Sequence, residues 1–349
     1  MEKMKAIVMK DVGDVRLEEV PIPHITEPDD VLLKVKAVGI CGTDVKIIEG
    51  KHHFKPNTIL GHEFVGEVIE IGTHVHHVKL GDRVAIDNNI RCGFCDFCRM
   101  GLTSQCVEIK TSALGVMRDG GNAEYCLVPE KQCYVLPDKI DDVLGTQVET
   151  LATVVNGYNT LLMLPYDYVL ILGFGPIGYL FAQLAKKMAA KVAVTEIDPY
   201  RISVAKQCGL EVWNPHEVDI PEKITQFTYG SKADIVVEAT GNALEQALQC
   251  VTPGGKVLPF GMDSSITASV VPNSITRWAT KILGLYLGQN TMVPSIRLFR
   301  EDRLNMEPFF TKVIPLEEGL KAYEMLGLNM KTLEHHPKSA MKIVMKVSD

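Results

Sequence analysis

The sequence lacks features that mark several large classes of protein. Two of its 349 residues are tryptophan, aromatic residues make up 7%, and 43 acidic residues outnumber 36 Lys and Arg, for a net charge of −7. Phosphate backbones are bound by clustered Lys and Arg, so we expect no nucleic-acid partner. The first ten residues, MEKMKAIVMK, show no basic segment followed by an apolar core. We therefore expect no secretory signal and a cytoplasmic protein.

A long uninterrupted hydrophobic run is also missing. Residues 168–185 carry no charge and approach the length of a membrane-spanning helix, but Gly173, Gly175, Pro176 and Gly178 interrupt them. A strand, a turn and a helix account for this stretch better, so we expect no membrane partner. Internal repeats and low-complexity segments are not evident either.

What is present is the composition of an ordinary globular protein, with 46% hydrophobic and 23% charged residues. The length suffices for two domains or one large one. The first part of the chain holds short β-rich runs separated by Gly, Pro and Asp, at 31–40, 64–72 and 82–87. Apolar residues at helical spacing follow at 142–164.

From residue 168 onward, strands and helices of about ten residues alternate, which predicts βαβ units and a parallel sheet. The expected strands are 168–173, 191–198, 233–241, 256–261 and 281–287, and the expected helices are 179–188, 199–209 and 243–251. An alternating strand at 338–347 suggests that the end of the chain returns to the first domain. The predicted fold class is α/β.

Four of the nine cysteines follow the pattern C-x2-C-x2-C-x7-C, at Cys92, Cys95, Cys98 and Cys106. Five of the eleven residues between them are charged or small turn formers, so we expect a loop. Four thiolates in one short loop suit a tetrahedral metal ion, with Zn²⁺ as the expected occupant. Such a closed shell leaves no position for a substrate, so the motif predicts a structural zinc site.

Residues 173–178 form a G-x-G-x-x-G motif that follows a strand and opens a helix, with Glu196 eighteen residues beyond its last glycine. This context is the dinucleotide fingerprint. A carboxylate at that place accepts hydrogen bonds from the adenosine ribose, which predicts NAD(H) over NADP(H), although Arg201 nearby could accept a 2′-phosphate. A domain of this type that binds no dinucleotide is the alternative. The predicted cofactor-binding residues here are Gly173, Gly175, Pro176, Ile177, Gly178, Glu196 and Arg201.

Three remote segments could supply an open metal site. Cys41 follows a strand in a glycine-rich turn, His62 and Glu63 precede another strand, and Glu149 lies in the apolar segment before the nucleotide motif. Each has a simpler interpretation as a buried thiol, a surface pair or a helix-surface carboxylate. Spacing cannot join them, so from the residues alone this site is only a possibility.

Taken together, several motifs resemble the medium-chain zinc-dependent alcohol and polyol dehydrogenase family, in its sorbitol or threonine dehydrogenase-like branch. They are GICGTD (39–44), GHEFVGEVIEIG (61–72), GDRV (81–84), the four-cysteine loop, ETLATVVNG (149–157) and the glycine motif. They occur in the family's order over nearly the whole chain. The resemblance implies a discontinuous GroES-like catalytic domain, residues 1–152 and 291–349, with a Rossmann NAD-binding domain, residues 153–290, inserted between.

The resemblance also assigns roles to single residues. It implies a catalytic zinc held by Cys41, His62, Glu63 and Glu149, with Glu149 standing where simple alcohol dehydrogenases have a second cysteine, which favours the polyol branch. Asp44 would orient a ligand of the metal ion, and the Thr43 hydroxyl would pass on the proton of the substrate. Thr240 and Phe260 lie at the strand ends where the nicotinamide half of the cofactor would rest.

Two residues depart from the family pattern. Lys46 stands where many relatives have a proton-relaying histidine; it could relay a proton, bind an anionic group of the substrate or face water. Thr150 stands where polyol enzymes often have proline after the glutamate.

The predicted function is a zinc-dependent oxidoreductase that transfers hydride from a secondary alcohol of a polyol, sugar or sugar phosphate to NAD⁺. A threonine-type, diol or simple secondary alcohol dehydrogenase is the alternative within the class. A non-catalytic member that keeps the fold and a zinc-independent quinone-type reductase are the alternatives outside it. Relatives of this kind imply a homotetramer or homodimer.

Overall fold

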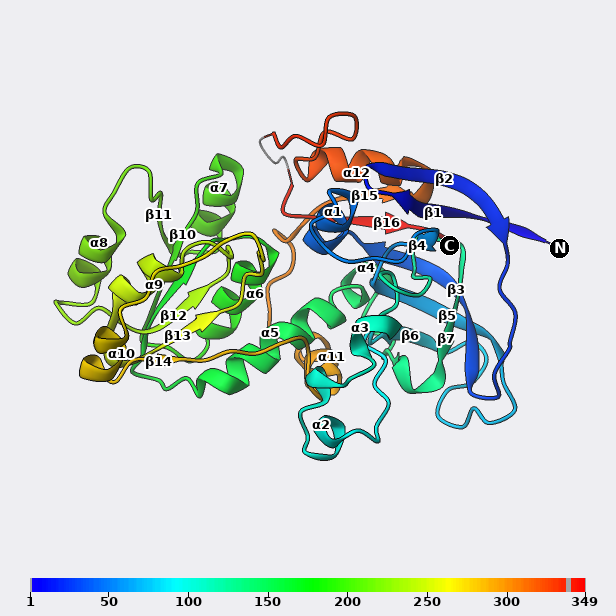
Figure 1. Ribbon diagram of the computed structural model, residues 1–349, viewed down its shortest axis with the longest axis horizontal. Helices are drawn as coiled ribbons and strands as arrows, with labels where there is room; N and C mark the ends of the chain where they lie inside the picture. Colours follow the sequence, from blue (N-terminus) through cyan, green and yellow to red (C-terminus); the bar gives the residue numbers. More distant parts are fainter. Residues whose placement is uncertain (1, 337–339, 349) are drawn as a thin grey trace. The chain divides into compact units, whose positions relative to one another are not determined.

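The computed structural model describes residues 2–336 and 340–348 (Figure 1). Contacts divide the chain into two compact units. Unit 1 comprises the chain up to Ala152, Gly288–Arg303 and the chain from Phe310 onward, and unit 2 comprises Thr153–Leu287 and Leu304–Phe309. The return of the chain to unit 2 at residues 304–309 has no counterpart in the expected boundaries.

Unit 1 is rich in short strands. Its strands are β1 (Lys3–Asp11), β2 (Asp14–Pro21), β3 (Asp30–Gly39), β4 (Thr58–Ile59), β5 (Glu63–Ile71), β6 (Arg83–Ile86), β7 (Tyr125–Pro129), β8 (Cys133–Val135), β15 (Phe310–Pro315) and β16 (Lys342–Lys346). Its helices are α1 (Gly42–Ile48), α2 (Asp96–Arg99), α3 (Ile109–Ser112), α4 (Asp142–Gly145), α11 (Met292–Arg300) and α12 (Gly319–Met325), with 3₁₀ turns at Thr103–Gln105, Glu130–Gln132 and Leu316–Glu318.

Strand β3 organises unit 1. It pairs with β5 along its length, with β7 at its beginning and with the C-terminal strand β16 at its end, all antiparallel. These strands belong to a seven-stranded sheet, beside a smaller sheet in the order β2-β1-β4. The apolar run of β3 is buried, with Val31, Leu33 and Val38 fully covered in the core of this unit. The expected strand at 338–347 is thus β16, although residues 338 and 339 lie outside the described part of the chain.

Unit 2 holds a six-stranded sheet in the order β11-β10-β9-β12-β13-β14, and all of its pairings are parallel. The strands are β9 (Tyr168–Leu172), β10 (Lys191–Thr195), β11 (Glu211–Trp213), β12 (Ala233–Glu238), β13 (Val251–Pro259) and β14 (Lys281–Ile282). The helices are α6 (Pro176–Ala185), α7 (Pro199–Gln207), α8 (Ile220–Phe227), α9 (Leu244–Cys250) and α10 (Pro272–Trp278). This strand order is that of the Rossmann fold, with its switch point between β9 and β12.

Helix signals in the sequence explain where these helices begin. Asp198 and Asp219 each precede a helix and accept hydrogen bonds from backbone N–H groups of its first turn, and Pro199 occupies the first position of α7. The parallel sheet and its alternating helices confirm the predicted α/β class. Among the described residues, no helix combines the length and apolarity that crossing a membrane requires; α6 has ten residues.

Three expected elements differ from the structure. The helix expected at 142–164 is two helices, α4 and α5 (Val148–Leu161), and it ends where Leu162 takes a positive φ of 46°. The strand expected at 281–287 pairs over two residues only. The four-cysteine loop contains two short helical turns, α2 and the 3₁₀ turn at Thr103–Gln105.

Candidate active site

The register of β3 and β5 brings Cys41 and His62 together. Gly39, at the end of β3, lies opposite Glu63, at the start of β5, so Cys41 and His62 emerge side by side at one end of the strand pair. The Cys41 thiol, the His62 imidazole and a Glu63 carboxylate oxygen all lie within 4.8 Å of one another. Zinc bonds of about 2.0–2.3 Å separate tetrahedral ligands by about 3.5 Å, so these atoms are close to the spacing that one ion needs.

Helix α1 fixes Cys41. The Cys41 Sγ accepts a hydrogen bond from the N–H of Thr43 at 3.4 Å, and Asp44 Oδ2 accepts one from the N–H of Cys41 at 2.9 Å, which forms a capping box. The capping role of Cys41 explains why the turn expected from GICGTD opens a short helix. Asp44 is fully buried, so its charge is held beside the cluster.

Asp44 also faces His62. Its Oδ1 lies 3.4 Å from His62 Nδ1, and neither atom has a hydrogen bond of good geometry. Burial opposes protonation of His62, but the nearby Cys41 and Asp44 raise its pKa well above the ordinary value. The surroundings of His62 therefore favour positive charge, as expected at a cation site.

Lys342 is the partner of Glu63, and no motif in the sequence indicates this pairing. Val344 in β16 pairs with Gly39 in antiparallel register, which places Lys342 level with Cys41. Its ammonium forms a salt bridge with the Glu63 carboxylate, and the two side chains are 2% and 1% exposed. Gln147 Nε2 lies 3.5 Å from the same carboxylate.

The Glu63 carboxylate is thereby kept charged. Burial would raise its pKa, but Lys342, His62 and the hydroxyl of Thr150 together lower it. A proline at position 150 has no hydroxyl, so this departure from the family pattern supplies Glu63 with an additional hydrogen-bonding group.

Glu149, in the first turn of α5, stands apart from the cluster. It does not belong to the group of ligand atoms that lie within 4.8 Å of one another in the described part of the chain. It lines a small polar pocket with Asp87, Asn89, Asn290 and Thr291 among others. Burial, together with the nearby Glu63 and Asp87, raises the pKa of Glu149 to about 7 against the opposing effect of His62. Its role as a ligand stays a prediction.

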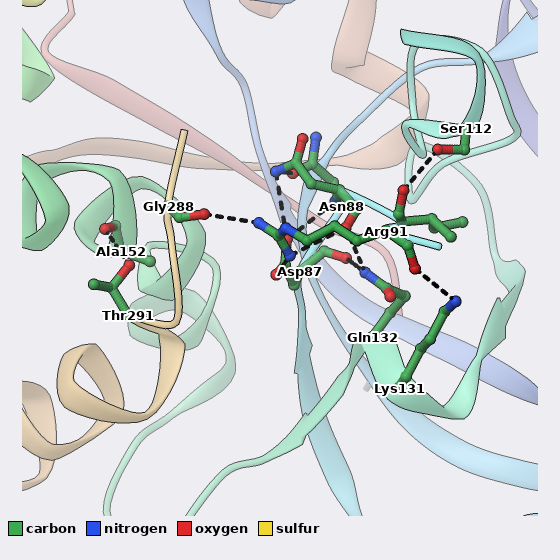
Figure 2. A network of polar contacts seen from close by, with 11 residues as sticks. Asp87, Asn88, Arg91, Ser112, Lys131, Gln132, Ala152, Gly288 and Thr291 are labelled. Carbon is green, nitrogen blue, oxygen red and sulfur yellow. Dashed lines mark hydrogen bonds and ion pairs between the residues drawn. The ribbon is translucent and has the colours of Figure 1, made fainter. Parts of the chain in front are cut away.

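Several residues that line this pocket, among them Asp87 and Gly288, belong to a polar network (Figure 2). The Arg91 guanidinium forms a salt bridge with Asp87 and donates to the carbonyls of Gly288, at 2.7 Å, and Asn89, at 3.2 Å. Gln132 donates to the carbonyls of Asp87 and Asn89. Arg91 directly precedes the four-cysteine loop, so its bond to Gly288 connects the start of that loop to the residue where the chain re-enters unit 1.

Beyond Arg91, the four-cysteine loop forms a second cluster. The Sγ atoms of Cys92, Cys95, Cys98 and Cys106 all lie within 4.8 Å of one another. Backbone N–H groups point at these sulfurs: that of Cys92 at Cys106 Sγ, at 3.3 Å, and that of Cys95 at Cys92 Sγ, at 3.4 Å. The N–H groups of Val107 and Cys98 lower the pKa of Cys95 to about 6. Donors placed to stabilise thiolates fit a bound Zn²⁺.

Thr43 and Lys46 lie on α1 and are both half-buried. The pKa of His52 is lowered by burial and also by the positive charges of His53, His62 and Lys46. His52 is therefore harder to protonate than an ordinary histidine, because it is partly buried and stands near other positive charges.

In unit 2, the glycine motif forms the turn that its spacing predicts. Gly175 caps α6, and Pro176 is its first residue. A Cβ at Gly178 would lie 2.0 Å from the carbonyl oxygen of Gly173, so the helix can approach the strand end only with glycine here. The N-terminus of α6 is then a ready site for a pyrophosphate.

Glu196 directly follows β10 beside this turn. The residue is 8% exposed, and its carboxylate accepts hydrogen bonds from the N–H groups of Phe174, at 3.0 Å, Ile197, at 2.8 Å, and Asp198, at 3.0 Å. These donors fix the orientation of the carboxylate beside the turn. The Arg201 guanidinium lies over Gly175, 3.3 Å from where a Cβ would stand.

The other predicted cofactor residues sit on neighbouring strand ends. Thr240 follows β12 and Phe260 follows β13, and these parallel strands end at the same edge of the sheet as β9. The predicted cofactor residues therefore gather along the carboxyl ends of the strands, where open α/β sheets bind ligands.

Unit 2 has a Rossmann sheet with a dinucleotide-binding turn. Unit 1 is rich in strands and holds a four-cysteine cluster and the Cys41–His62–Glu63 cluster, and the described residues contain no further group of this kind. Together these features define the class of zinc- and nicotinamide-dependent dehydrogenases. Comparison with known proteins agrees. Residues 27–138 match the alcohol dehydrogenase GroES-like domain, and residues 176–301 match the zinc-binding dehydrogenase family.

Individual relatives cover almost the whole chain. L-threonine 3-dehydrogenase of Pyrococcus horikoshii is 36% identical over 93% of this chain and 96% of its own length. Sorbitol dehydrogenase of Ovis aries is 32% identical over 94% and 95%. The structure of a zinc-binding dehydrogenase from Sinorhizobium meliloti bound to NADP has a TM-score of 0.90 at 29% identity, covering 99% of this chain and all of that one. The chain belongs to the medium-chain zinc-dependent alcohol and polyol dehydrogenase family.

Proposed function

We propose that the protein oxidises a secondary alcohol group of a polyol, sugar or sugar phosphate and passes the hydride to NAD⁺. The observation that carries the proposal is the convergence of Cys41, His62 and Glu63, from segments separated in the sequence, on one buried point with the donors of a catalytic zinc site.

The residues of this chain then take separate roles. Cys41, His62 and Glu63, with Glu149 from the adjoining pocket, would hold the catalytic Zn²⁺, and Cys92, Cys95, Cys98 and Cys106 the structural one. A zinc ion at the first site lowers the pKa of a hydroxyl that binds it. Asp44 holds His62 in place, and the Thr43 hydroxyl moves the proton of the substrate hydroxyl away from the site.

Lys46 is the proposed group for the outer end of that proton path, or for an anionic group of the substrate. The positive charge of Lys46 contributes to lowering the pKa of the nearby His52, so Lys46 is the group proposed to meet such an anion. A phosphate on the substrate would suit it, so phosphorylated polyols are included in the proposed class.

Glu196 supports NAD(H) as the cofactor, because a fixed carboxylate at the end of β10 repels a 2′-phosphate. Replacing Glu196 with Ala should relax the preference for NAD⁺, measured as the ratio of kcat/KM with NAD⁺ and NADP⁺. Arg201→Ala is the matched comparison, since it removes a group that could accept the phosphate. Unchanged discrimination in Glu196→Ala would contradict this assignment.

A second candidate substrate is a hydroxy amino acid. It is favoured by the 36% identity with a threonine dehydrogenase. L-Threonine carries both an ammonium and a carboxylate next to the reacting carbon, whereas sorbitol carries neither, so the two substrate classes need different groups around the same metal site.

A screen for NADH formation tests the proposal directly, with polyols, their phosphates, L-threonine and diols as substrates. Turnover of a polyol or its phosphate is the expected result, and turnover of threonine alone would select the second candidate. Cys41→Ser should abolish oxidation and leave NADH binding intact. Normal turnover in that variant would exclude Cys41 as a ligand of the catalytic ion.

We further propose a homotetramer or homodimer in the cytoplasm, without nucleic-acid or membrane partners. All nine cysteines are free thiols, which is compatible with a reducing compartment. Light scattering after gel filtration should give four or two times the 38.6 kDa mass of the chain. A monomer would contradict the assembly.

A further inference from the structure

The further inference concerns Glu238, a buried acid in unit 2 that lies outside every motif. It is the last residue of β12 and is 2% exposed. Its neighbours in the sheet are Leu172 of β9 and Pro259 of β13. Glu238 therefore sits at the switch point of the sheet, between the strand that precedes the glycine motif and the strand that precedes Phe260.

The Glu238 carboxylate is held by the loop that follows β12. Its carboxylate accepts hydrogen bonds from the N–H of Thr240, at 2.8 Å, and from the N–H of Gly241, at 2.8 and 3.1 Å, and it also bonds the Thr240 hydroxyl. Hydrogen bonds to an ionised acceptor are about twice as strong as neutral ones. These bonds turn two successive N–H groups of the loop inward and so fix the conformation of residues 239–242.

The main chain of Glu238 holds a second loop. Its carbonyl accepts hydrogen bonds from the N–H groups of Phe260, at 2.8 Å, and Gly261, at 2.9 Å. The two loops then meet without side chains, because a Cβ at Gly261 would lie 2.1 Å from the nitrogen of Gly241. One residue thus sets the positions of both strand-end loops.

The glycine motif contacts the same assembly. The φ angle of Gly173 is +92°, and a Cβ there would lie 2.6 Å from the Cγ2 atom of Thr240. Thr240 therefore packs directly on the first glycine of the turn, and its orientation depends on the bonds that Glu238 makes.

We propose that Glu238 is a positioning residue for the nicotinamide half of the cofactor, acting through the loops 239–242 and 260–262 without touching the cofactor itself. This inference rests on the proposed function, and on the family resemblance that places Thr240 and Phe260 at the nicotinamide. The adenosine half depends on the glycine motif and Glu196, and in the described part of the chain the side-chain and loop hydrogen bonds of Glu238 go instead to Thr240, Gly241, Phe260 and Gly261. Loss of the Glu238 carboxylate should therefore weaken one half of the site and spare the other.

Two ligands separate these halves. NADH has both, and ADP-ribose lacks the nicotinamide. In Glu238→Gln, an amide N–H₂ group meets the inward-facing N–H groups of the loop, so NADH should bind about tenfold more weakly, whereas ADP-ribose should bind within about twofold of the original affinity. NADH is followed by its fluorescence and ADP-ribose by competition with it. Glu245→Gln is the matched control, because Glu245 is exposed in the same unit and accepts one backbone N–H, from Ser269, at 2.6 Å.

Equal losses for the two ligands, or no loss for either, would overturn the inference. Should Glu238→Gln fold incorrectly, Glu238→Asp provides the same comparison of the loss of NADH affinity with the loss of ADP-ribose affinity. It keeps the charge on a shorter side chain, so it should weaken NADH binding selectively but by a smaller factor. An original chain that binds neither ligand would overturn the proposed function and this inference with it. If the original chain binds both ligands but the Glu238 variants lose affinity for NADH and ADP-ribose equally, the inference is overturned and the proposed function stands.

Discussion

Lys342 and Glu63 form a salt bridge with almost no access to water, and removing one partner of such a pair strands the other charge. We predict that Lys342→Met lowers the free energy of unfolding by about 3–5 kcal/mol, measured by denaturant unfolding of the zinc-loaded protein. Lys3→Met is the matched control. Lys3 lies 3.7 Å from Glu19 in a pair whose side chains are 61% and 67% exposed, so its loss should cost less than about 1 kcal/mol.

The cysteines should differ widely in their rates of alkylation, because their thiol pKa values differ. Burial raises the pKa of Cys133 and of Cys250 to about 12, so almost no thiolate exists at pH 8 and both should resist alkylation in the folded protein. The pKa of Cys95 is lowered to about 6, so in chelator-treated protein Cys95 should react rapidly at pH 7 and more slowly as the pH falls below 6. Added Zn²⁺ should protect it. Mass spectrometry of peptides labelled with iodoacetamide measures each site, and rapid labelling of Cys250 in the folded chain would contradict its burial.

Single functional residues could be predicted where they lie together in a short sequence motif. The cysteine spacing and the glycine motif with Glu196 specify their clusters over short stretches of sequence, and the structure assembles both. Cys41, His62 and Glu63 needed the family resemblance, because their proximity depends on the register of β3 and β5. Lys342 could not be found at all, since it reaches Glu63 through the pairing of β16 with β3.

At the scale of elements, the network around Arg91 connects the start of the four-cysteine loop to Gly288 and Asp87 (Figure 2). We predict that Arg91→Gln lowers the free energy of unfolding by about 1.5–3 kcal/mol, the usual value of a hydrogen bond to a charged group, while the zinc content stays unchanged. Lys131→Met is the matched control, because the exposed Lys131 also belongs to this network (Figure 2) but lies at its edge, where it donates to the carbonyl of Arg91 at 3.0 Å. Equal stability losses in the two variants would contradict the stabilising role of the Arg91 guanidinium.

Element boundaries were less predictable than element types. Alternation of strands and helices correctly indicates the parallel sheet, but β14 keeps only two of seven expected residues because pairing with β13 ends there. Helix α1 was missed because Gly42 and Thr43 resemble a turn. Only the hydrogen bonds of Cys41 and Asp44 show that they begin a helix.

For the whole molecule, we predict about two zinc ions per chain, one held by four thiolates and one in the open cluster. Cys92→Ser should lose the first and lower the melting temperature, and Cys41→Ser should lose the second. Atomic absorption on the purified proteins gives the stoichiometry. One ion in the original chain, lost on Cys92→Ser, would remove the catalytic zinc from the proposal.

The two compact units should also respond to different ligands. NADH at 100 times its Kd should stabilise unit 2 by about 2.7 kcal/mol, whereas a zinc chelator should destabilise unit 1. Calorimetry should therefore show one thermal transition that rises with NADH and another that falls with chelator. A single transition that moves with both additives would show that the units unfold together.

The wide separation of β16 from β5 along the chain has a consequence for biosynthesis. A ribosome that adds about 5–20 residues per second reaches Lys342 roughly 15–55 s after Glu63. Until then, β3 and β5 can pair but the Glu63 carboxylate has no ammonium to bury against. A message broken before codon 342, or a nonsense codon upstream of it, would yield a chain whose central strands carry an uncompensated internal charge. Chains that lack Lys342 should therefore be degraded more readily than chains in which β16 has paired with β3.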